Sequence, residues 1–157
     1  ILITEEGSTF RSAYGAIGLT PDASTSYLLP QLVGLRRAQR MTLLGYVLDA
    51  KEAVEWGLCT ECVPAGRSRA RAREIAERLA GGPTQAYGHT KRLLRVAARR
   101  ALTEHLEDES VTLRAAAATP DAAEGIAAFF ERRPPAFRGL AAVEQARAGQ
   151  ANQTRQA

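Results

Sequence analysis

The stretch from Ile17 to Gly34 contains Pro21 followed directly by Asp22, where an extended segment is expected to turn into a helix. A carboxylate at the start of a helix can accept hydrogen bonds from the free backbone N–H groups of the first turn. It can also face a ligand as an acid, a base or a nucleophile. The position alone favours the capping role, because such caps are common.

Length and composition indicate one domain with a hydrophobic core. The chain has 157 residues, of which 45% are hydrophobic, and a chain of this size can bury a core. Its apolar runs stay well short of the ~20 residues that a membrane span needs. The first residues, Ile1–Thr4, lack the charged and long apolar regions of a secretory signal. We therefore expect no membrane association and a sequence that begins inside a fold, with an upstream portion missing.

The charge pattern argues against a nucleic-acid partner. The net charge of +4 comes from 21 basic and 17 acidic residues that are mostly interspersed along the chain. The densest basic run, from Arg67 to Arg73, meets Glu74 and Glu77 on an expected helix. Aromatic stacking residues are absent from this run, so it is interpreted as a solvated helix face.

Cys59 and Cys62 form a single C-x-x-C pair. A zinc site needs about four ligands, and the sequence offers no second pair of cysteines. The pair lies in an extended-looking segment, where residues three apart point to opposite faces. We interpret both cysteines as unpaired structural thiols, with no metal, which suits a cytoplasmic location.

The remaining pattern predicts short strands followed by helices. Ile1–Ile3 and Thr9–Ala16 are read as extended segments. The expected helices follow Asp22, then cover Arg36–Leu44, Asp49–Trp56, Arg67–Ala80, Pro83–Arg100, Leu102–Ala118 and Asp121–Glu131. Asp49 with Glu52, and Asp121 with Glu124, have the spacing of a capping box.

Five blocks in this order resemble the crotonase superfamily, the enoyl-CoA hydratases and isomerases: Gly18–Asp22, Leu29–Gly34, Asp49–Leu58, Thr90–Leu94 and Asp121–Gly139. The resemblance covers Ile1 to Gly139 and corresponds to the C-terminal half of such a protein. It implies an α/β fold in which residues 1–66 end a spiral of ββα turns and residues 67–139 form a helical trimerisation region. Residues 140–157 are expected to be a disordered tail.

The resemblance also implies an activity on acyl-CoA thioesters in fatty acid metabolism. Members polarise the thioester carbonyl with two backbone N–H donors, which stabilise an enolate-like oxyanion. Both donors come from the N-terminal half in this family, so we expect this chain alone to lack them. The family further implies a homotrimer or a hexamer, and no cofactor apart from the coenzyme A of the substrate.

Tyr14 and Asp22 narrow the choice within the family. Many hydratases place a catalytic glutamate at the position of Tyr14, and a phenol with an ordinary pKa of about 10 cannot replace it as a base near neutral pH. An acid at the position of Asp22 is shared with several double-bond isomerases, where it moves a proton along the acyl chain. It is also shared with 4-chlorobenzoyl-CoA dehalogenases, where the aspartate attacks the aromatic ring. The glycine pair that usually follows is replaced here by Ser24 and Thr25.

Other candidate site residues follow from the same resemblance. Tyr14, Ile17, Leu19 and Tyr27 are candidates for contact with the acyl group. Phe129 and Arg132 match the spacing of a phenylalanine and a basic residue that contact the CoA of a neighbouring subunit. The alternatives are core packing for Phe129 and a solvated helix end for Arg132.

Three hypotheses remain open at this point. The leading hypothesis is an isomerase with Asp22 as acid and base. The second is a dehalogenase or hydrolase with Asp22 as nucleophile, which would leave a covalent adduct on that residue. The third is a non-catalytic assembly module or a fragment.

Overall fold

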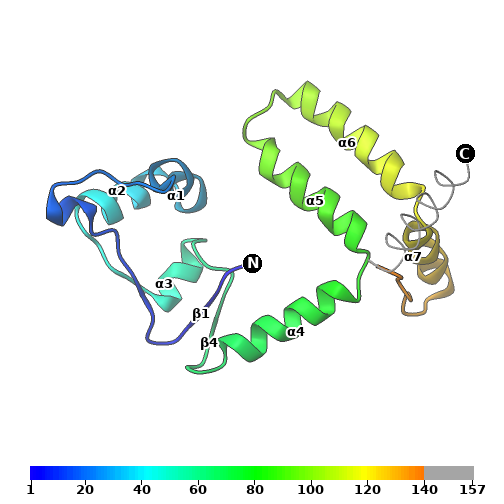
Figure 1. Ribbon diagram of the computed structural model, residues 1–157, viewed down its shortest axis with the longest axis horizontal. Helices are drawn as coiled ribbons and strands as arrows, with labels where there is room; N and C mark the ends of the chain where they lie inside the picture. Colours follow the sequence, from blue (N-terminus) through cyan, green and yellow to red (C-terminus); the bar gives the residue numbers. More distant parts are fainter. Residues whose placement is uncertain (140–157) are drawn as a thin grey trace, which may run out of the picture. The chain divides into compact units, whose positions relative to one another are not determined.

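The computed structural model describes residues 1–139. The chain divides into two compact units, one spanning Ile1–Glu74 and the other starting at Ile75 (Figure 1). The division falls within helix α4 (Ser68–Ala80). The domain boundary predicted between residues 66 and 67, where the spiral core meets the helical region, stays a prediction, and the predicted tail 140–157 lies outside the described residues.

The first unit combines short strands with short helices. Its elements in order are β1 (Ile3–Glu5), β2 (Thr9–Phe10), the 3-10 helix η1 (Tyr14–Ile17), α1 (Thr25–Val33), α2 (Leu35–Leu43), β3 (Leu48–Asp49), α3 (Ala50–Glu55) and β4 (Glu61–Val63). β1 pairs in parallel with β4, with Ile3 opposite Glu61. β2 pairs antiparallel with β3, with Thr9 opposite Asp49. The extended segment predicted over residues 58–63 is confirmed only in its second half, because β4 includes Cys62 and begins two residues after Cys59.

The core of the first unit lies between α1, α2 and α3. Apolar residues at helical spacing on α1 and α2 face it, which is why these helices form a packed pair. Gly34 separates them with a φ of 81°, in a region that glycine adopts without strain. The buried cluster comprises Leu29, Val33, Ala38, Met41, Leu48, Ala53 and Cys59.

An aromatic stack packs against this core, with Tyr46 in the loop after α2 and Trp56 at the C-terminal end of α3. The rings of Tyr46 and Trp56 are parallel, with centroids 5.6 Å apart. The Arg40 guanidinium lies 3.7 Å from the Tyr46 ring centroid, a cation–π contact. The Tyr46 hydroxyl donates to Glu52 Oε1 at 2.6 Å. Glu52 completes the predicted capping box, because its backbone N–H donates to Asp49 Oδ1 at 2.8 Å and its carboxylate accepts from the Asp49 N–H.

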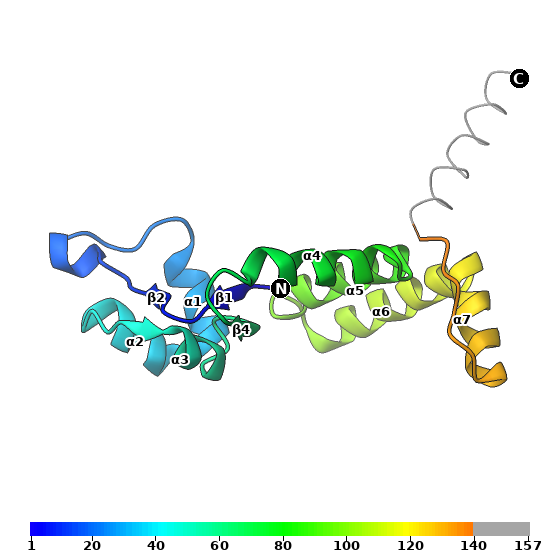
Figure 2. The same ribbon diagram turned by 90° about the horizontal axis from the view of Figure 1, so that it is seen from below.

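The second unit is helical. After the end of α4 it contains α5 (Thr84–Ala97), α6 (Leu102–Ala117) and α7 (Pro120–Glu131). Helices α5 and α6 lie side by side as a hairpin (Figure 2). In the part of the chain that the structure describes, no helix combines the length and the apolar character needed to cross a membrane.

The second predicted capping box is wrong. Thr119 is the N-cap of α7 and accepts from the Ala122 N–H at 3.2 Å, with Pro120 as the first helical residue. Asp121 is instead buried and accepts from the backbone N–H groups of Arg138 at 2.7 Å and Gly139 at 3.1 Å. Asp121 therefore stabilises the backbone of residues 138–139 and does not cap the first turn of α7.

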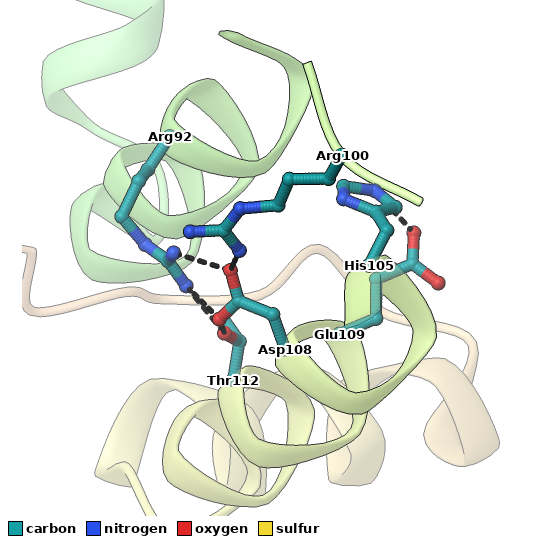
Figure 3. A network of polar contacts seen from close by, with 6 residues as sticks. All are labelled: Arg92, Arg100, His105, Asp108, Glu109 and Thr112. Atoms are coloured by element: carbon teal, nitrogen blue, oxygen red, sulfur yellow. Dashed lines mark hydrogen bonds and ion pairs between the residues drawn. The ribbon is translucent and has the colours of Figure 1, made fainter. Parts of the chain in front are cut away.

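A charged network joins α5 to α6 (Figure 3). Arg92 binds both carboxylate oxygens of Asp108, at 2.6 and 2.7 Å, and also donates to the Thr112 hydroxyl at 2.6 Å. Arg100 binds the same carboxylate. The Asp108 side chain keeps only 19% of its surface exposed, so this two-point contact is partly shielded from water. Arg92 is the main reason that the pKa of Asp108 lies well below its usual range.

The start of α4 is held by a residue from β1. Glu5 accepts from the backbone N–H groups of Gly66 at 2.9 Å and Ser68 at 2.8 Å. These groups have no partner within the helix, so Glu5 serves as a distant cap. The Ser68 side chain, followed by the Gly66 and Ser68 N–H groups, stabilises the carboxylate and lowers the pKa of Glu5 to about 2.

We predict that Glu5→Gln lowers the melting temperature in a pH-dependent way. The folded-state pKa is depressed from 4.5 to about 2, so the stabilisation is fully present above pH 4.5 and is lost as the pH falls towards 2. Thermal unfolding followed by circular dichroism should therefore show a gap between wild type and variant that closes in acid. Glu6→Gln, at an exposed neighbouring position, is the control, and a gap that persists at pH 2 would contradict the cap.

We also predict that Asp108→Asn destabilises the α5–α6 hairpin by a few degrees at neutral pH. The substitution removes the carboxylate charge that faces Arg92 and Arg100. Because the pKa of Asp108 is depressed, this contribution is present above its ordinary value of 3.8 and fades below it. Glu107→Gln on the exposed side of α6 is the matched control. Equal melting temperatures for the two variants would show that the network adds no stability.

Candidate active site

Tyr14 and Asp22 come together in the first unit. Tyr14 begins η1, and Asp22 follows eight residues later in the loop before α1. The Tyr14 hydroxyl donates a hydrogen bond to Asp22 Oδ1. Tyr14 is half-buried and Asp22 is exposed. The structure therefore pairs two of the residues that the sequence singles out separately.

The capping role of Asp22 is wrong in this structure. The N-cap of α1 is Ser24, and no side chain accepts a hydrogen bond at that cap. Asp22 contributes only its backbone carbonyl, which accepts from the Thr25 N–H at 2.8 Å. Its carboxylate is directed to Tyr14, so it is not used to stabilise the helix.

The backbone after Asp22 is strained. Ala23 has a φ of 47° and Ser24 a φ of 64°, both in the left-handed region. Each such residue with a Cβ costs of order 1 kcal/mol. Ser24 is the first of the two positions, Ser24 and Thr25, where the family resemblance implies glycine, and it adopts a conformation that a glycine would adopt freely. Strain of this kind persists only where the surroundings hold it, and it is found most often at functional sites.

The backbone of Tyr14 is also fixed. The 3-10 helix that it starts is closed by the Leu19 N–H, which donates to the Tyr14 carbonyl at 3.0 Å. A Cβ on Gly15 would lie 3.2 Å from the Thr42 carbonyl oxygen, so η1 approaches the end of α2 closely. The phenol is therefore carried by a segment that rests on the core helices.

Electrostatics keep Tyr14 protonated. The hydrogen bond to Asp22, followed by partial burial, raises the pKa of Tyr14 above its usual value of 10. A phenolate next to a carboxylate is disfavoured, so the hydroxyl stays a donor across the physiological range. Tyr14 thus cannot act as a base there, in agreement with the sequence argument that a phenol cannot replace the catalytic glutamate of many hydratases.

The three apolar or aromatic candidates around the loop are exposed. Ile17 keeps 69% of its surface exposed, Leu19 60% and Tyr27 47%. They therefore do not enclose the Asp22 carboxylate within this unit. Their expected contact with an acyl group stays a prediction.

Phe129 and Arg132 lie in the second unit, at the end of α7. Phe129 is 78% exposed and meets Phe130 edge to face with ring centroids 5.7 Å apart. Core packing within this unit, the alternative weighed for Phe129, is therefore not observed. Arg132 is exposed and caps the helix in a left-handed conformation, with a φ of 54°. Contact with CoA stays a prediction for both residues.

The two cysteines are free thiols. Cys59 is buried, and this burial raises its pKa, while Cys62 is half-buried. Within residues 1–139, no group of three histidine, cysteine, aspartate or glutamate side chains is placed to hold a metal ion.

Comparison with known proteins identifies the family. Residues 1–140 match the family model described as Enoyl-CoA hydratase/isomerase. The chain is 34% identical to 1,2-epoxyphenylacetyl-CoA isomerase of Escherichia coli, over 88% of this chain and 53% of that protein. It is 33% identical to 4-chlorobenzoyl coenzyme A dehalogenase-1 of an Arthrobacter species, over 82% of this chain and 47% of that protein. The chain therefore belongs to the enoyl-CoA hydratase/isomerase family.

Solved structures agree with this assignment. A crystal structure of an enoyl-CoA hydratase/isomerase from Cupriavidus metallidurans superimposes with a TM-score of 0.82 at 35% identity, covering 88% of this chain and 52% of that one. The predicted fold class, the C-terminal part of the crotonase spiral with its helical region, is thereby confirmed. The chain spans about half the length of the curated relatives it matches.

Sequence reasoning missed the Tyr14–Asp22 hydrogen bond. The sequence singles out Tyr14 because a phenol cannot serve as a base near neutral pH. It singles out Asp22 because this residue precedes a helix. The signal in the sequence for this hydrogen bond is a phenol hydroxyl at Tyr14 and, eight residues later, a carboxylate at Asp22 that can accept from it. Asp22 lies in an irregular loop that continues into left-handed conformations at Ala23 and Ser24, which no propensity rule predicts at non-glycine residues.

We predict that Asp22→Asn lowers the pKa of Tyr14 towards 10. The neutral amide no longer opposes the phenolate charge, which is what raises the value in wild type. Titration of a 13C label at tyrosine Cζ by NMR measures each phenol separately. Tyr46 is the internal control, because Glu52 raises its pKa independently. An unchanged Tyr14 titration would contradict the pairing.

Proposed function

We propose that the protein carrying this chain isomerises a double bond in an acyl-CoA thioester, with Asp22 as the acid and base. In a 3-enoyl-CoA, the carboxylate removes a proton from C2, and the electron pair moves onto the thioester oxygen to give a dienolate. The protonated Asp22 then returns the proton to C4, while the double bond forms between C2 and C3. The reaction is balanced without a cofactor, since coenzyme A enters only as part of the substrate.

The state of Asp22 is the observation that carries this proposal. A carboxylate that caps a helix has its oxygens committed to backbone N–H groups. Asp22 is exposed, and within residues 1–139 its carboxylate accepts from the Tyr14 hydroxyl and not from the start of a helix, so an oxygen remains available to a substrate. Tyr14 beside it stays neutral and protonated, so it does not serve as a second base. The pair therefore supplies one acid–base group, Asp22.

The remainder of the site is part of the same proposal. The dienolate requires oxyanion donors, which the family resemblance places in the N-terminal half of such proteins. Ile17, Leu19 and Tyr27 would contact the acyl chain. Phe129 and Arg132 would contact the CoA of a neighbouring subunit in a homotrimer or hexamer. The cytoplasm is the location that fits this assignment and the free thiols.

A second candidate function is supported by the similarity to the Arthrobacter dehalogenase. In that alternative Asp22 acts as a nucleophile. It attacks an aromatic carbon and displaces halide to give an aryl ester, or it attacks the thioester carbonyl and displaces CoA thiolate to give a mixed anhydride; water then hydrolyses the adduct and restores the carboxylate. Isomerisation forms no such adduct. Intact-mass and peptide mass spectrometry after rapid quenching with aryl-CoA and enoyl-CoA substrates distinguishes the two reactions.

We predict that Asp22→Asn lowers kcat for enoyl-CoA isomerisation about 100- to 10,000-fold, the usual contribution of a positioned acid–base group. Acyl-CoA binding should persist, because the amide keeps the shape of the side chain. The assay follows the absorbance of 2-enoyl thioesters formed from 3-enoyl-CoA by the natural polypeptide that carries this chain.

Glu55→Gln, an exposed carboxylate on α3, is the matched control and should keep full activity. Turnover retained in Asp22→Asn would refute the acid–base role. Absence of turnover in wild type on 2-enoyl-, 3-enoyl- and aryl-CoA substrates would favour a non-catalytic assembly module. Native mass spectrometry of the same protein measures how many copies assemble, and the proposal expects a multiple of three.

A further inference from the structure

We propose that Tyr14 is a positioning residue for Asp22: its hydroxyl fixes the carboxylate through Oδ1, so that Oδ2 is the oxygen that exchanges the proton with the substrate. The inference rests on the proposed function and adds that the two residues have different roles. Tyr14 acts through Asp22, and it neither contacts the reacting carbon nor transfers a proton itself.

Two anchors define the position of Asp22. One is the backbone turn, in which Ala23 and Ser24 adopt left-handed conformations and the Thr25 N–H binds the Asp22 carbonyl. This turn fixes where the side chain leaves the backbone. An aspartate side chain still rotates about two bonds, so the turn alone leaves the carboxylate orientation open.

The Tyr14 hydroxyl supplies the second anchor. It binds Oδ1 from outside the loop, on a 3-10 helix that rests against α2 through Gly15 and Thr42. A hydrogen bond to an ionised acceptor is stronger and more directional than one between neutral groups. The two anchors together restrict both torsions of Asp22 at a site that is otherwise exposed.

The chemistry of a phenol suits this task. It presents one donor proton on a rigid ring, and the elevated pKa of Tyr14 keeps that proton in place. A carboxylate at this position would repel Asp22 instead. The same donor would be of little value as a general acid, because the neighbouring anion makes loss of its proton harder.

Positioning and substrate contact differ in their kinetic signatures. A residue that binds the acyl group equally in the ground state and the transition state affects KM, whereas a residue that orients the reacting group affects kcat. Misplacement of a reacting group by about 1 Å can cost roughly 100-fold in rate. We therefore expect Tyr14→Phe to lower kcat about 10- to 100-fold with KM nearly unchanged.

The experiment compares Tyr14→Phe and Tyr14→Trp with wild type in the natural polypeptide. Tryptophan restores an aromatic donor, so it should recover part of the lost kcat. Tyr46→Phe is the matched control, because it removes a tyrosine–carboxylate bond from the same unit, to Glu52, without touching Asp22. It should leave kcat and KM unchanged.

A second measurement works without turnover. NMR relaxation of a 13C-labelled Asp22 Cβ reports the order of its side chain, which should fall in Tyr14→Phe and rise again in Tyr14→Trp. Loss of order together with loss of kcat supports the proposal. Unchanged order in Tyr14→Phe overturns it, whatever the activity, as does a rise in KM at constant kcat. A wild-type protein without turnover refutes the proposed function, while the order of Asp22 still decides whether Tyr14 positions it.

Discussion

The free backbone N–H groups at helix starts constrain much of this structure, and acidic and hydroxyl side chains meet that need at three of the helices within residues 1–139. Asp49 serves α3 from the adjacent position, Thr119 serves α7, and Glu5 serves α4 from a strand far away in sequence. Each of these acceptors is thereby committed to structure. The carboxylate before α1 differs from these three, because α1 starts at a strained serine and Asp22 accepts from Tyr14 instead of capping the helix.

Local rules predict the parts of the fold in which the partner of a residue is nearby. The capping box of Asp49 and Glu52 is such a case, as is the helix that Ala38 and Met41 place against the core. The rule fails at Asp121, whose partners Arg138 and Gly139 lie beyond the helix that it was expected to start. The sequence Thr119–Pro120 offers a competing start signal, a hydroxyl cap followed by a proline suited to the first helical position, and it prevails.

The candidate site likewise has a part that the sequence predicts and a part that it does not. The resemblance singles out Asp22 and Tyr14 one by one, because each occupies a position with a recognisable role in the family. Their hydrogen bond joins residues eight apart, and the two residues after Asp22, Ala23 and Ser24, adopt left-handed conformations that sequence preferences disfavour. Chain position could not reveal this contact, because rules of helical and strand periodicity do not apply to the irregular loop that carries Asp22. The exposure of Phe129 is likewise a property of the packed unit and not of its spacing from Arg132.

The first unit holds two tyrosine–carboxylate pairs, and their surroundings explain why only one suits chemistry. Glu52 accepts from Tyr46 and from the Asp49 N–H, beside a stacked tryptophan and an arginine, so its oxygens are occupied within a structural cluster. Asp22 stands in an exposed loop, where Tyr14 orients it without enclosing it. A proton-transfer group must be held in place and yet keep an oxygen available to the substrate. The pair of Tyr14 and Asp22 meets both conditions, whereas the pair of Tyr46 and Glu52 meets only the first.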